Sequence, residues 1–385
     1  MDTRKPRIGF VCGLSTFVNG VPYVGAALKY IKLWQLLSDE IVWIGASNLQ
    51  IDSKLLDNVI TMGIRWSDVH EKPLLIQVLY HLSQQIKITL KLFKLRKVDI
   101  LIFARGLDFY ILPILFVRIF LHNKVIIKSD GRSSVAAMMY LGKGKRYKVA
   151  VIKIIEWMSY FLANKIVVDS TYAIKLYNMQ KYGDKICVAS SDCFVDTHFF
   201  TNYKELSDRE YDVAYVGRFS RKKGFLEFMQ AVQLLPRSEQ NKVIIIGAEP
   251  VDYEVQKLLT DIKTQNKARV VDWAEPDELV RYLNDIKVVV IPSYGEGMTS
   301  TALEAIACGC MVIATPVGSL PAIIKDESTG FILKNNSPTE IVAGIIRALS
   351  YPRLDSIAQN ARLLIDEEYT YEAMSDKWRN ILKCL

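Results

Sequence analysis

With 385 residues, the chain is too long for one small hydrophobic core, and two domains of roughly 150–200 residues each are expected. Half of its residues are hydrophobic and 23% are charged, as is ordinary for a globular protein. The longest apolar stretch, at 109–121, is interrupted by Pro113 and Arg118. A membrane span needs about 20 residues, so this stretch is excluded as one.

Positive charge is concentrated in the first half of the chain. Residues 1–200 hold 27 Lys and Arg against 15 Asp and Glu, whereas residues 201–385 hold 22 against 26. This asymmetry indicates two domains that face different partners, the basic one an anionic lipid, nucleic acid or substrate. The six cysteines form no CxxC pair and no zinc spacing, so we expect reduced thiols. The N-terminus runs directly into a strand-like segment, and we expect a cytoplasmic protein without a signal peptide.

Short β-branched runs alternate with helix-period segments along the whole chain. Such runs are typical of strands that are buried on both faces of a parallel sheet. The pattern predicts an α/β protein of two Rossmann-like, doubly wound domains, with a cleft between the carboxyl ends of the two sheets. The predicted strands lie at 7–12, 40–45, 98–103, 124–128, 165–169, 212–217, 242–247, 268–272, 287–292 and 310–315.

The polar stretch at 200–212 separates the two sets of strands and is predicted to be an interdomain linker. We therefore expect an N-terminal domain over residues 1–199 and a C-terminal domain over residues 200–355. Residues 356–385 are predicted to form one or two further helices.

A basic loop, "VGRFSRKKGF" at 216–225, follows one predicted strand and precedes a helix. Arg218 and one of Lys222 or Lys223 would place two cations at the helix start, where they could bind a diphosphate. A solvated basic loop is the alternative. The chain contains neither GxGxxG nor GxxxxGK[ST], which argues against an NAD(P) enzyme and a P-loop NTPase.

The stretch "IPSYGEGMTSTALEAIACG" at 291–309 also joins a strand to a helix. The helix is predicted from about Met298 to Cys308, with Gly309 ending it. Free amides at its start favour an anion or a sugar oxygen. Glu296 lies in the loop, and Glu304 is the only charge of the helix, so both carboxylates could accept hydrogen bonds from sugar hydroxyls. The alternative is an ordinary loop residue and an exposed helix residue.

Together these segments resemble the family-4 retaining glycosyltransferases of the GT-B fold. The resemblance is strong over about 163–335, and the N-terminal domain matches only in pattern. By analogy with this family, the C-terminal helices would cross back to the first domain. The matching segments are "VGRF" and "KKG" within 216–224, "PSYGEGMTSTALEAIACG" at 292–309, "MVIATPVGSLPAII" at 311–324, "STGFIL" at 328–333, "ANKIVVDS" at 163–170 and "CFVDTHFF" at 193–200.

The resemblance implies a role for each donor-side residue. Arg218 and Lys223 would bind the donor's diphosphate beside Gly217 and neutralise it as it leaves. Glu304 would take the ribose hydroxyls. Glu296 would contact the transferred sugar, helped by the amides of Gly297, Met298 and Thr299.

The N-terminal domain departs from the family pattern at two places. Gly20 is followed by Val-Pro instead of lying in a Gly-Gly loop, and Asp130 precedes Gly131 where many members have a His. On the acceptor side, Asp130 could hold a sugar hydroxyl or take the acceptor's proton. A turn-forming Asp-Gly is an equally open interpretation.

The sequence therefore predicts transfer of a sugar from a UDP- or GDP-sugar to a glycan or lipid-linked acceptor, with retention, in cell-surface polysaccharide or glycolipid synthesis. We expect no metal and no further cofactor, because two cations and a helix start already face the diphosphate. The alternatives are a nucleotide-sugar epimerase or hydrolase on the same fold, and a nucleic-acid-binding protein. The last is the least favoured, because the basic clusters carry aliphatic rather than aromatic residues.

Two basic clusters, at 87–97 and 142–148, suggest peripheral association with an anionic membrane surface on the cytoplasmic side. The alternative for 87–97 is an amphipathic helix that packs on the sheet and leaves its lysines solvated.

Overall fold

The computed structural model describes most of the chain. The described residues are 4–385 apart from 13–16, 19–20, 23–24, 47–57, 65–72, 96–97, 105–109, 130–145, 191–192, 237–241, 248–252 and 273.

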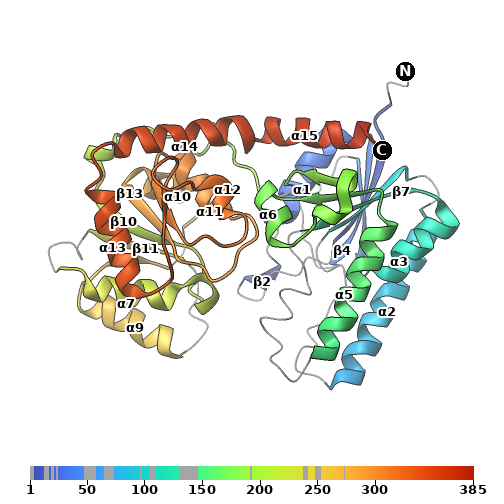
Figure 1. Ribbon diagram of the computed structural model, residues 1–385, viewed down its shortest axis with the longest axis horizontal. Coiled ribbons are helices and arrows are strands. Elements are labelled where there is room, and N and C mark those ends of the chain that lie inside the picture. Colours follow the sequence, from blue (N-terminus) through green and yellow to red (C-terminus); the bar gives the residue numbers. More distant parts are fainter. Residues whose placement is uncertain are drawn as a thin grey trace. The chain divides into compact units, whose positions relative to one another are not determined.

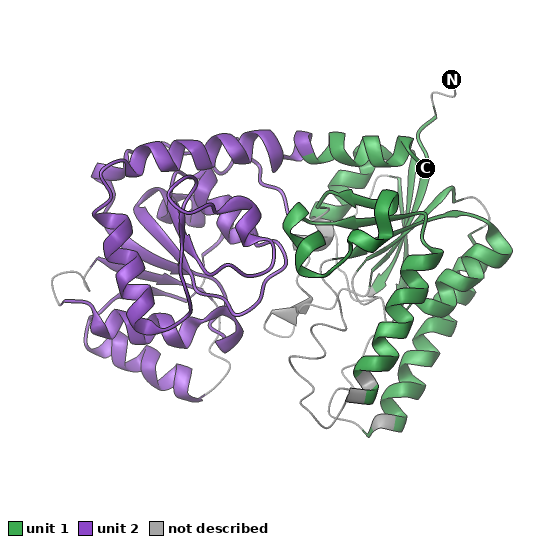
Figure 2. Ribbon diagram, viewed as in Figure 1, with its two compact units in different colours: residues 1–192, 374–385 green, residues 193–373 purple. Residues whose placement is uncertain are grey.

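The chain forms two compact units (Figure 2). The first comprises residues 1–192 together with 374–385, and the second comprises residues 193–373. The sequence placed this boundary at 199/200 and treated 356–385 as a separate helical segment. In the structure, the helix at 354–368 belongs to the second unit, and only the last residues group with the first.

The first unit is built on a seven-stranded parallel sheet. Its strand order is β5-β4-β1-β6-β7-β8-β9, and β2 (Phe17–Val18) pairs with β3 (Val21–Pro22) in a separate antiparallel ladder. The central strands are almost fully buried, as parallel strands covered by helices on both faces should be. The sheet contains β1 (Arg7–Cys12), β4 (Glu40–Ala46), β5 (Val59–Ile64), β6 (Ile100–Ala104), β7 (Lys124–Ser129), β8 (Lys165–Val168) and β9 (Ile186–Val188).

Three neighbouring helices of this unit, α2, α3 and α5, lie side by side in Figure 1. The apolar stretch excluded as a membrane span forms α3 and the π-helical turn η3. Among the described helices, none is both long and apolar enough to cross a membrane. The helices are α1 (Gly25–Leu37), α2 (Leu74–Phe93), α3 (Ile111–Phe116), η3 (Val117–Leu121), α5 (Arg146–Leu162), α6 (Thr171–Leu176) and η5 (Gln180–Lys185).

The last residues of the chain pack onto the first unit through tryptophan. The rings of Trp34 on α1 and Trp378 on α15 (Tyr371–Lys383) meet edge to face at 4.6 Å, and both are fully buried. The Trp378 indole N–H donates to the Ser190 carbonyl at 2.7 Å. Both the ring body and its polar edge are therefore satisfied inside this unit.

The second unit is built on a six-stranded parallel sheet of order β12-β11-β10-β13-β14-β15. Its strands are β10 (Tyr211–Val216), β11 (Val243–Ile246), β12 (Arg269–Val271), β13 (Ile286–Ile291), β14 (Met311–Ala314) and β15 (Phe331–Ile332). Its helices are η6 (Leu206–Asp208), η7 (Arg221–Lys223), α7 (Phe225–Leu234), α9 (Tyr253–Thr264), α10 (Pro276–Asn284), α11 (Ser300–Ala307), α12 (Leu320–Ile323), α13 (Pro338–Leu349) and α14 (Leu354–Glu368).

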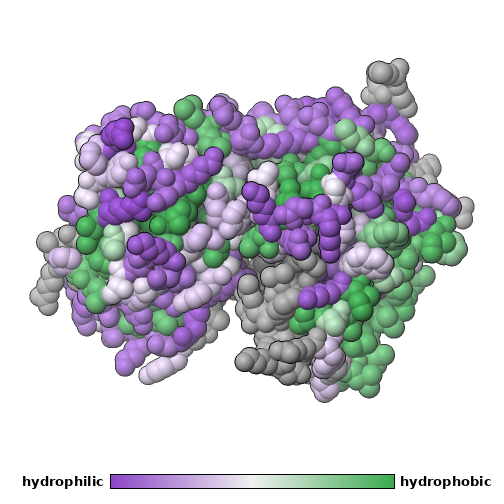
Figure 3. Space-filling view, viewed as in Figure 1, coloured by the Kyte–Doolittle hydropathy of each residue, from purple (hydrophilic) through white to green (hydrophobic). Residues whose placement is uncertain are grey.

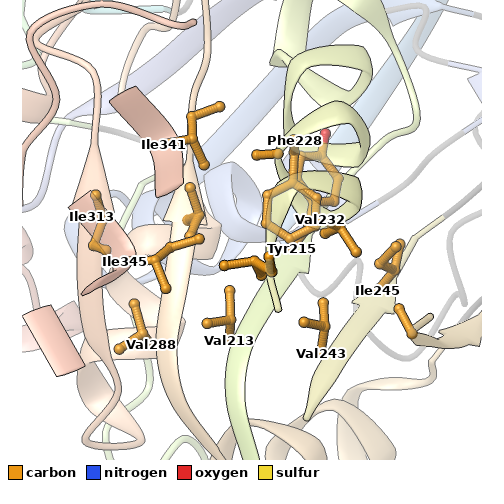
Figure 4. Close-up of a cluster of buried hydrophobic side chains, with 14 of the residues drawn as sticks. Val213, Tyr215, Phe228, Val232, Val243, Ile245, Val288, Ile313, Ile341 and Ile345 are labelled. Carbon is orange, nitrogen blue, oxygen red and sulfur yellow. The ribbon is translucent and has the colours of Figure 1, made fainter. Parts of the chain in front are cut away.

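Helices α7 and α13 cover one face of this sheet (Figure 4). Phe228 and Val232 of α7 and Ile341 and Ile345 of α13 point onto alternate residues of the strands, such as Val213. Both helices pack on the sheet through an apolar stripe of this kind. Burying each such side chain stabilises the fold by about 1.5–3 kcal/mol.

The strand orders place a topological switch point in each sheet. In the second unit, the chain builds β10, β11 and β12 outward to one side and then returns to place β13 on the other side of β10. Parallel α/β sheets bind ligands outside the carboxyl ends of the two strands that flank such a point. The segments that follow β10 and β13 are therefore the first place to look for a site.

The predicted doubly wound fold is confirmed, and each predicted strand has a counterpart within about two residues. The short strands β2 and β3 were not predicted, and in the two parallel sheets three further strands were not predicted: β5, β9 and β15. Strands β9 and β15 are three and two residues long, and all three lie at sheet edges, where the apolar pattern is weak.

Candidate active site

Two loops meet at the switch point of the second sheet. One runs from β10 through η7 to α7 and carries Arg218 and Lys223. The other runs from β13 to α11 and carries Glu296. The neighbouring strands β10 and β13 pair in parallel, so both loops leave the sheet at the same edge.

A salt bridge joins the two loops. The Lys223 ammonium donates to both oxygens of Glu296, at 2.7 Å to Oε1 and 2.8 Å to Oε2. The Ser293 hydroxyl donates to Glu296 Oε1 at 2.6 Å. The Lys223 side chain is 23% exposed and that of Glu296 is 7% exposed, so the pair lies at the surface of the loop junction. Two residues that the sequence placed on separate loops are thus brought together.

Arg218 lies two residues after the end of β10, in the loop that also carries Lys223. Its side chain is exposed and makes no hydrogen bond with any described residue, while its carbonyl accepts a bond of 2.7 Å from the Tyr215 hydroxyl. Burial raises the pKa of Tyr215 far above its usual range, Glu296 raises it further, and Arg218 lowers it. Arg218 and Glu296 therefore both act electrostatically on Tyr215.

Two glycines allow close backbone approaches at the site, Gly224 between the two loops and Gly318 between the Glu296 loop and the segment that joins β14 to α12. Gly224 has a φ of +67°, and a Cβ there would lie 1.9 Å from the carbonyl oxygen of Pro292 at the end of β13. Gly318 has a φ of +58°, and a Cβ there would lie 1.9 Å from the Glu296 carbonyl oxygen. Any other residue would be strained at both positions and would push the loops apart.

Several residues that the sequence did not single out hold the Glu296 loop in place. The Thr315 hydroxyl donates to the Ser293 carbonyl at 2.6 Å, and the Asn336 amide donates to the same carbonyl at 3.1 Å. The Tyr294 hydroxyl donates to Glu227 on α7 at 2.7 Å, and this bond is the main reason why the pKa of Tyr294 rises to about 12. Their partners lie far along the chain, so no local pattern could have identified them.

The start of α11 presents open backbone donors beside the salt bridge. The helix runs from Ser300 to Ala307, two residues later than predicted at its start, and Thr299 is its N-cap residue without a side-chain cap. Among the described residues, the amides of Gly297, Met298 and Thr299 donate to no protein acceptor. Such amides, with the helix dipole behind them, attract anionic or electron-rich oxygens.

Glu304 lies in the second turn of α11 and is half-buried. Its charge helps to raise the pKa of Cys308, although burial is the larger cause. Gly309 adopts a φ of +77° after Cys308, which confirms the predicted end of the helix.

The remaining predicted residues are placed differently. Gly217 directly follows β10 and has a φ of +149°, a positive value that favours glycine. Lys222 is exposed, so the structure selects Lys223 as the partner of Glu296. Asp130 and Gly20 lie outside the described residues, as does most of the basic segment at 142–148.

One buried cation was missed by the sequence analysis. Arg209 is 4% exposed and donates to the carbonyls of Ile286 at 2.7 Å and Cys308 at 2.8 Å, and to Asn202 Oδ1 at 2.8 Å. It ties the predicted linker to the base of β13 and to the end of α11. Arg209 therefore stabilises the strand and the helix on either side of the Glu296 loop without contacting Glu296 itself.

Chemically, the site offers an exposed guanidinium, an ammonium, a carboxylate and open amides at one sheet edge. Cations and amides suit a diphosphate, and carboxylates suit hydroxyl groups. A ligand that carries both groups could replace the Lys223–Glu296 bond with bonds to each partner.

Comparison with known proteins locates the similarity mainly in the second unit. Residues 199–364 match the family model described as "Glycosyl transferases group 1". An uncharacterized glycosyltransferase of Methanocaldococcus jannaschii is 28% identical over 179 residues, which are 46% of each chain. The lipopolysaccharide 1,2-N-acetylglucosaminetransferase of Salmonella typhimurium is 26% identical over 179 residues, 44% of this chain and 47% of that protein. The chain thus spans about half the length of the curated relatives it matches.

Solved structures are similar over almost the whole chain. HepE of Anabaena, crystallised with UDP, has a TM-score of 0.76 at 14% identity and covers 98% of this chain and 100% of its own. The sucrose-phosphate synthase of Thermosynechococcus elongatus has a TM-score of 0.75 at 16% identity and covers 99% of both chains. At such identities the likeness establishes the fold, that of the GT-B glycosyltransferases.

Proposed function

Because residues 199–364 match the family model of the glycosyl transferases group 1, we propose that the protein transfers a sugar from a nucleoside-diphosphate sugar to a glycan or lipid-linked acceptor. The observation that carries this proposal is the Lys223–Glu296 bond at the switch point of the second sheet. This bond places a cation that can bind a phosphate next to a carboxylate that can accept a hydrogen bond from a hydroxyl group.

In the proposed reaction, the bond between the anomeric carbon and the diphosphate oxygen breaks, and the electron pair stays on the diphosphate. Lys223 leaves Glu296 for the phosphate and, with Arg218, stabilises the charge that develops there. Glu296, which the Ser293 hydroxyl holds in place, then accepts a hydrogen bond from a hydroxyl group of the sugar. The amides before α11 bind the remaining oxygens, and Glu304 takes the ribose.

The acceptor's hydroxyl oxygen forms the new bond to the same carbon and loses its proton. Asp130 stays the predicted group for this proton. We propose retention of the anomeric configuration and a reaction that needs no metal, since Arg218, Lys223 and the amides can neutralise the leaving group. Activity unchanged by EDTA is the expected result.

The printed names of similar proteins support the choice of substrates. HepE of Anabaena was solved both with UDP and with UDP-glucose, so a UDP-sugar is the first donor to test. The relatives include the lipopolysaccharide enzyme and a capsular polysaccharide biosynthesis glycosyltransferase of Staphylococcus aureus. We therefore propose an acceptor in the synthesis of a cell-surface polysaccharide or glycolipid.

Calorimetric titration with a panel of UDP- and GDP-sugars tests the donor site. Lys223→Ala should weaken binding of the preferred donor about tenfold to a hundredfold, because a charge-assisted bond to phosphate is lost. Lys242→Ala is the matched control: this exposed lysine lies at the opposite, amino-end edge of the same sheet, and its removal should leave affinity unchanged. Equal affinities for the two variants would refute the assignment.

Product analysis then separates transfer from the other reactions on this scaffold. With a glycan or lipid-linked acceptor, we expect a new glycoside and a free nucleoside diphosphate. Release of free sugar alone, or an altered sugar still linked to the nucleotide, would indicate a hydrolase or an epimerase instead. Lys223→Ala should reduce the transfer rate by a factor on the order of 100–1,000.

A further inference from the structure

Helix α2 of the first unit leaves many of its large apolar side chains exposed. Its outward side chains recur every three or four residues and are 44–69% exposed. They form one apolar stripe along the helix: Leu75, Leu79, Leu82, Ile86, Leu90 and Phe93. A surface helix normally turns such a stripe toward the core.

The inward face of α2 is mixed. Ile88 and Leu92 are fully buried in the core of the first unit, and Gln84 and Gln85 are 1% and 6% exposed. Gln85 Oε1 accepts the Leu112 amide of α3 at 2.9 Å, so α2 is packed on this side. Folding nevertheless leaves eight large apolar side chains of α2 exposed, the six of the stripe together with Ile76 and Val78.

Helix α5, which packs on α3 as α2 does, carries a second exposed apolar stripe. Val151, Ile154, Trp157 and Phe161 of α5 are 53–65% exposed, while Glu156 on the opposite face is fully buried. The Trp157 and Phe161 rings stack at 5.8 Å.

Phe93 at the end of α2 also connects to η3. Its ring lies 6.2 Å from that of Phe116, which lies 5.3 Å from the 68% exposed Phe120. We call the outward apolar side chains of α2, η3 and α5 the apolar face. Apolar side chains gather over α2 and α3 in the space-filling view (Figure 3).

The charges around the apolar face have one sign. Lys87, Lys94 and Lys153 are exposed and Lys91 is half-buried. The sequences of α2, α3, η3 and α5 contain one acidic residue, and that residue is the fully buried Glu156. The surface therefore combines apolar side chains with cations and presents no carboxylate from these helices.

The second unit shows that this gathering is not general. Its exposed large aliphatic side chains are single residues on separate helices, such as Leu234 on α7, Ile346 on α13 and Leu363 on α14. Scattered residues of this kind are normal on protein surfaces, whereas a contiguous apolar patch marks an interaction site.

We infer that the apolar face docks onto an anionic lipid bilayer, with its apolar side chains in the interface and its lysines at the headgroups. Interfacial helices bind membranes through this combination of apolar area and basic charge. A second copy of the chain fits less well, because a symmetric pairing would bring the same lysines together without a carboxylate between them. The inference does not depend on the proposed transferase activity.

This surface differs from the basic segments predicted from the sequence. The segment at 87–97 covers only the end of α2, and most of the 142–148 segment lies outside the described residues. The structure shifts the main contribution from lysines to exposed leucines and aromatic rings.

Vesicle flotation tests the inference with the full chain. We expect binding to vesicles of phosphatidylcholine mixed with phosphatidylglycerol, weaker binding at high salt, and little binding to phosphatidylcholine alone. The double variant Leu79→Gln/Leu90→Gln should lose affinity on the order of a hundredfold, about tenfold for each leucine. The control Leu234→Gln/Leu363→Gln, equally exposed but on the second unit, should bind as the wild type does.

Fluorescence of Trp157 gives a second readout that does not rely on a destabilising change. Of the four tryptophans that the structure describes, Trp34, Trp43 and Trp378 are fully buried, whereas Trp157 is 54% exposed. On addition of the mixed vesicles, its emission should shift to the blue and be quenched by brominated lipid, and Trp157→Phe should remove both effects. Absence of vesicle binding, equal binding of the two double variants, or concentration-dependent dimers abolished by Leu79→Gln/Leu90→Gln would each overturn the inference.

Discussion

Each unit carries a lysine paired with a carboxylate at the carboxyl edge of its parallel sheet, and the two pairs differ in exposure. In the first unit, Lys128 on β7 contacts Asp169, just after β8, at 2.6 Å, and the side chains are 0% and 5% exposed. In the second, Lys223 contacts Glu296 at 2.7 Å, with 23% and 7% exposure. Both pairs lie at the carboxyl edge of a parallel sheet, but Lys128 is fully buried whereas Lys223 is partly exposed to solvent.

This difference separates a structural pair from a functional one. A fully buried pair has given up its hydration, so either partner left alone is an uncompensated charge. A partly exposed lysine keeps water or a ligand as an alternative partner. We therefore expect the first pair to control stability and the second to control binding.

The largest expected effect is that of Lys128→Met on the free energy of unfolding. Removing one partner of a buried ion pair typically costs about 3–5 kcal/mol, because the other partner stays buried without its counter-ion. Urea unfolding of the full chain measures this cost. Lys124→Met, at the exposed start of the same strand, should change stability by less than about 0.5 kcal/mol.

The double variant Lys128→Met/Asp169→Leu sharpens the test. It removes both charges, so it should be more stable than Lys128→Met alone. If the double variant were the less stable of the two, the buried charge of Asp169 would not be the cause of the loss.

The next effect concerns the buried cation of the second unit. Arg209→Met would leave the carbonyls of Ile286 and Cys308 without this donor, and we expect a loss of about 3 kcal/mol in the free energy of unfolding. Arg281→Met, whose side chain is 69% exposed, is the control and should have little effect. A loss in Arg209→Met no larger than in the control would show that the linker does not need this anchor.

A smaller effect on stability is expected for Lys223→Met. The lysine is partly exposed and Ser293 still bonds Glu296, so removing it should cost at most about 1 kcal/mol. The same variant should nevertheless weaken donor binding, as calorimetry would measure. A stability loss as large as that of Lys128→Met would contradict the distinction between the two pairs.

The smallest effect is a dependence of stability on alkaline pH. Burial raises the pKa of Cys310 from 9.0 to about 11, against an opposing effect of Arg209. Between these values the unfolded chain loses this proton and the folded chain keeps it, so stability falls as pH rises through the window and is unaffected below it. From pH of about 8.5 to about 10, chemical unfolding should show a smaller stability loss in Cys310→Ala than in wild type.

The fold and part of the site were predictable because their signals are local. Buried β-branched runs indicate parallel strands, and the loops holding Lys223 and Glu296 are recognisable by their glycines and charges. Contacts between distant segments were not predictable: Asn336, Thr315 and Arg209 act through partners more than 20 residues away. The period of α2 is visible in the sequence, but only the packing of Gln85, Ile88 and Leu92 shows which side faces inward.

The bond between Lys223 and Glu296 also imposes a condition on any ligand. If inorganic phosphate binds the Lys223 ammonium, the Glu296 carboxylate loses its counter-ion. If a plain sugar binds the carboxylate, the ammonium loses its partner. A molecule that presents an anion and a hydroxyl together satisfies both at once. The Lys223–Glu296 bond therefore disfavours each of these two ligands alone and favours a single molecule that carries both groups.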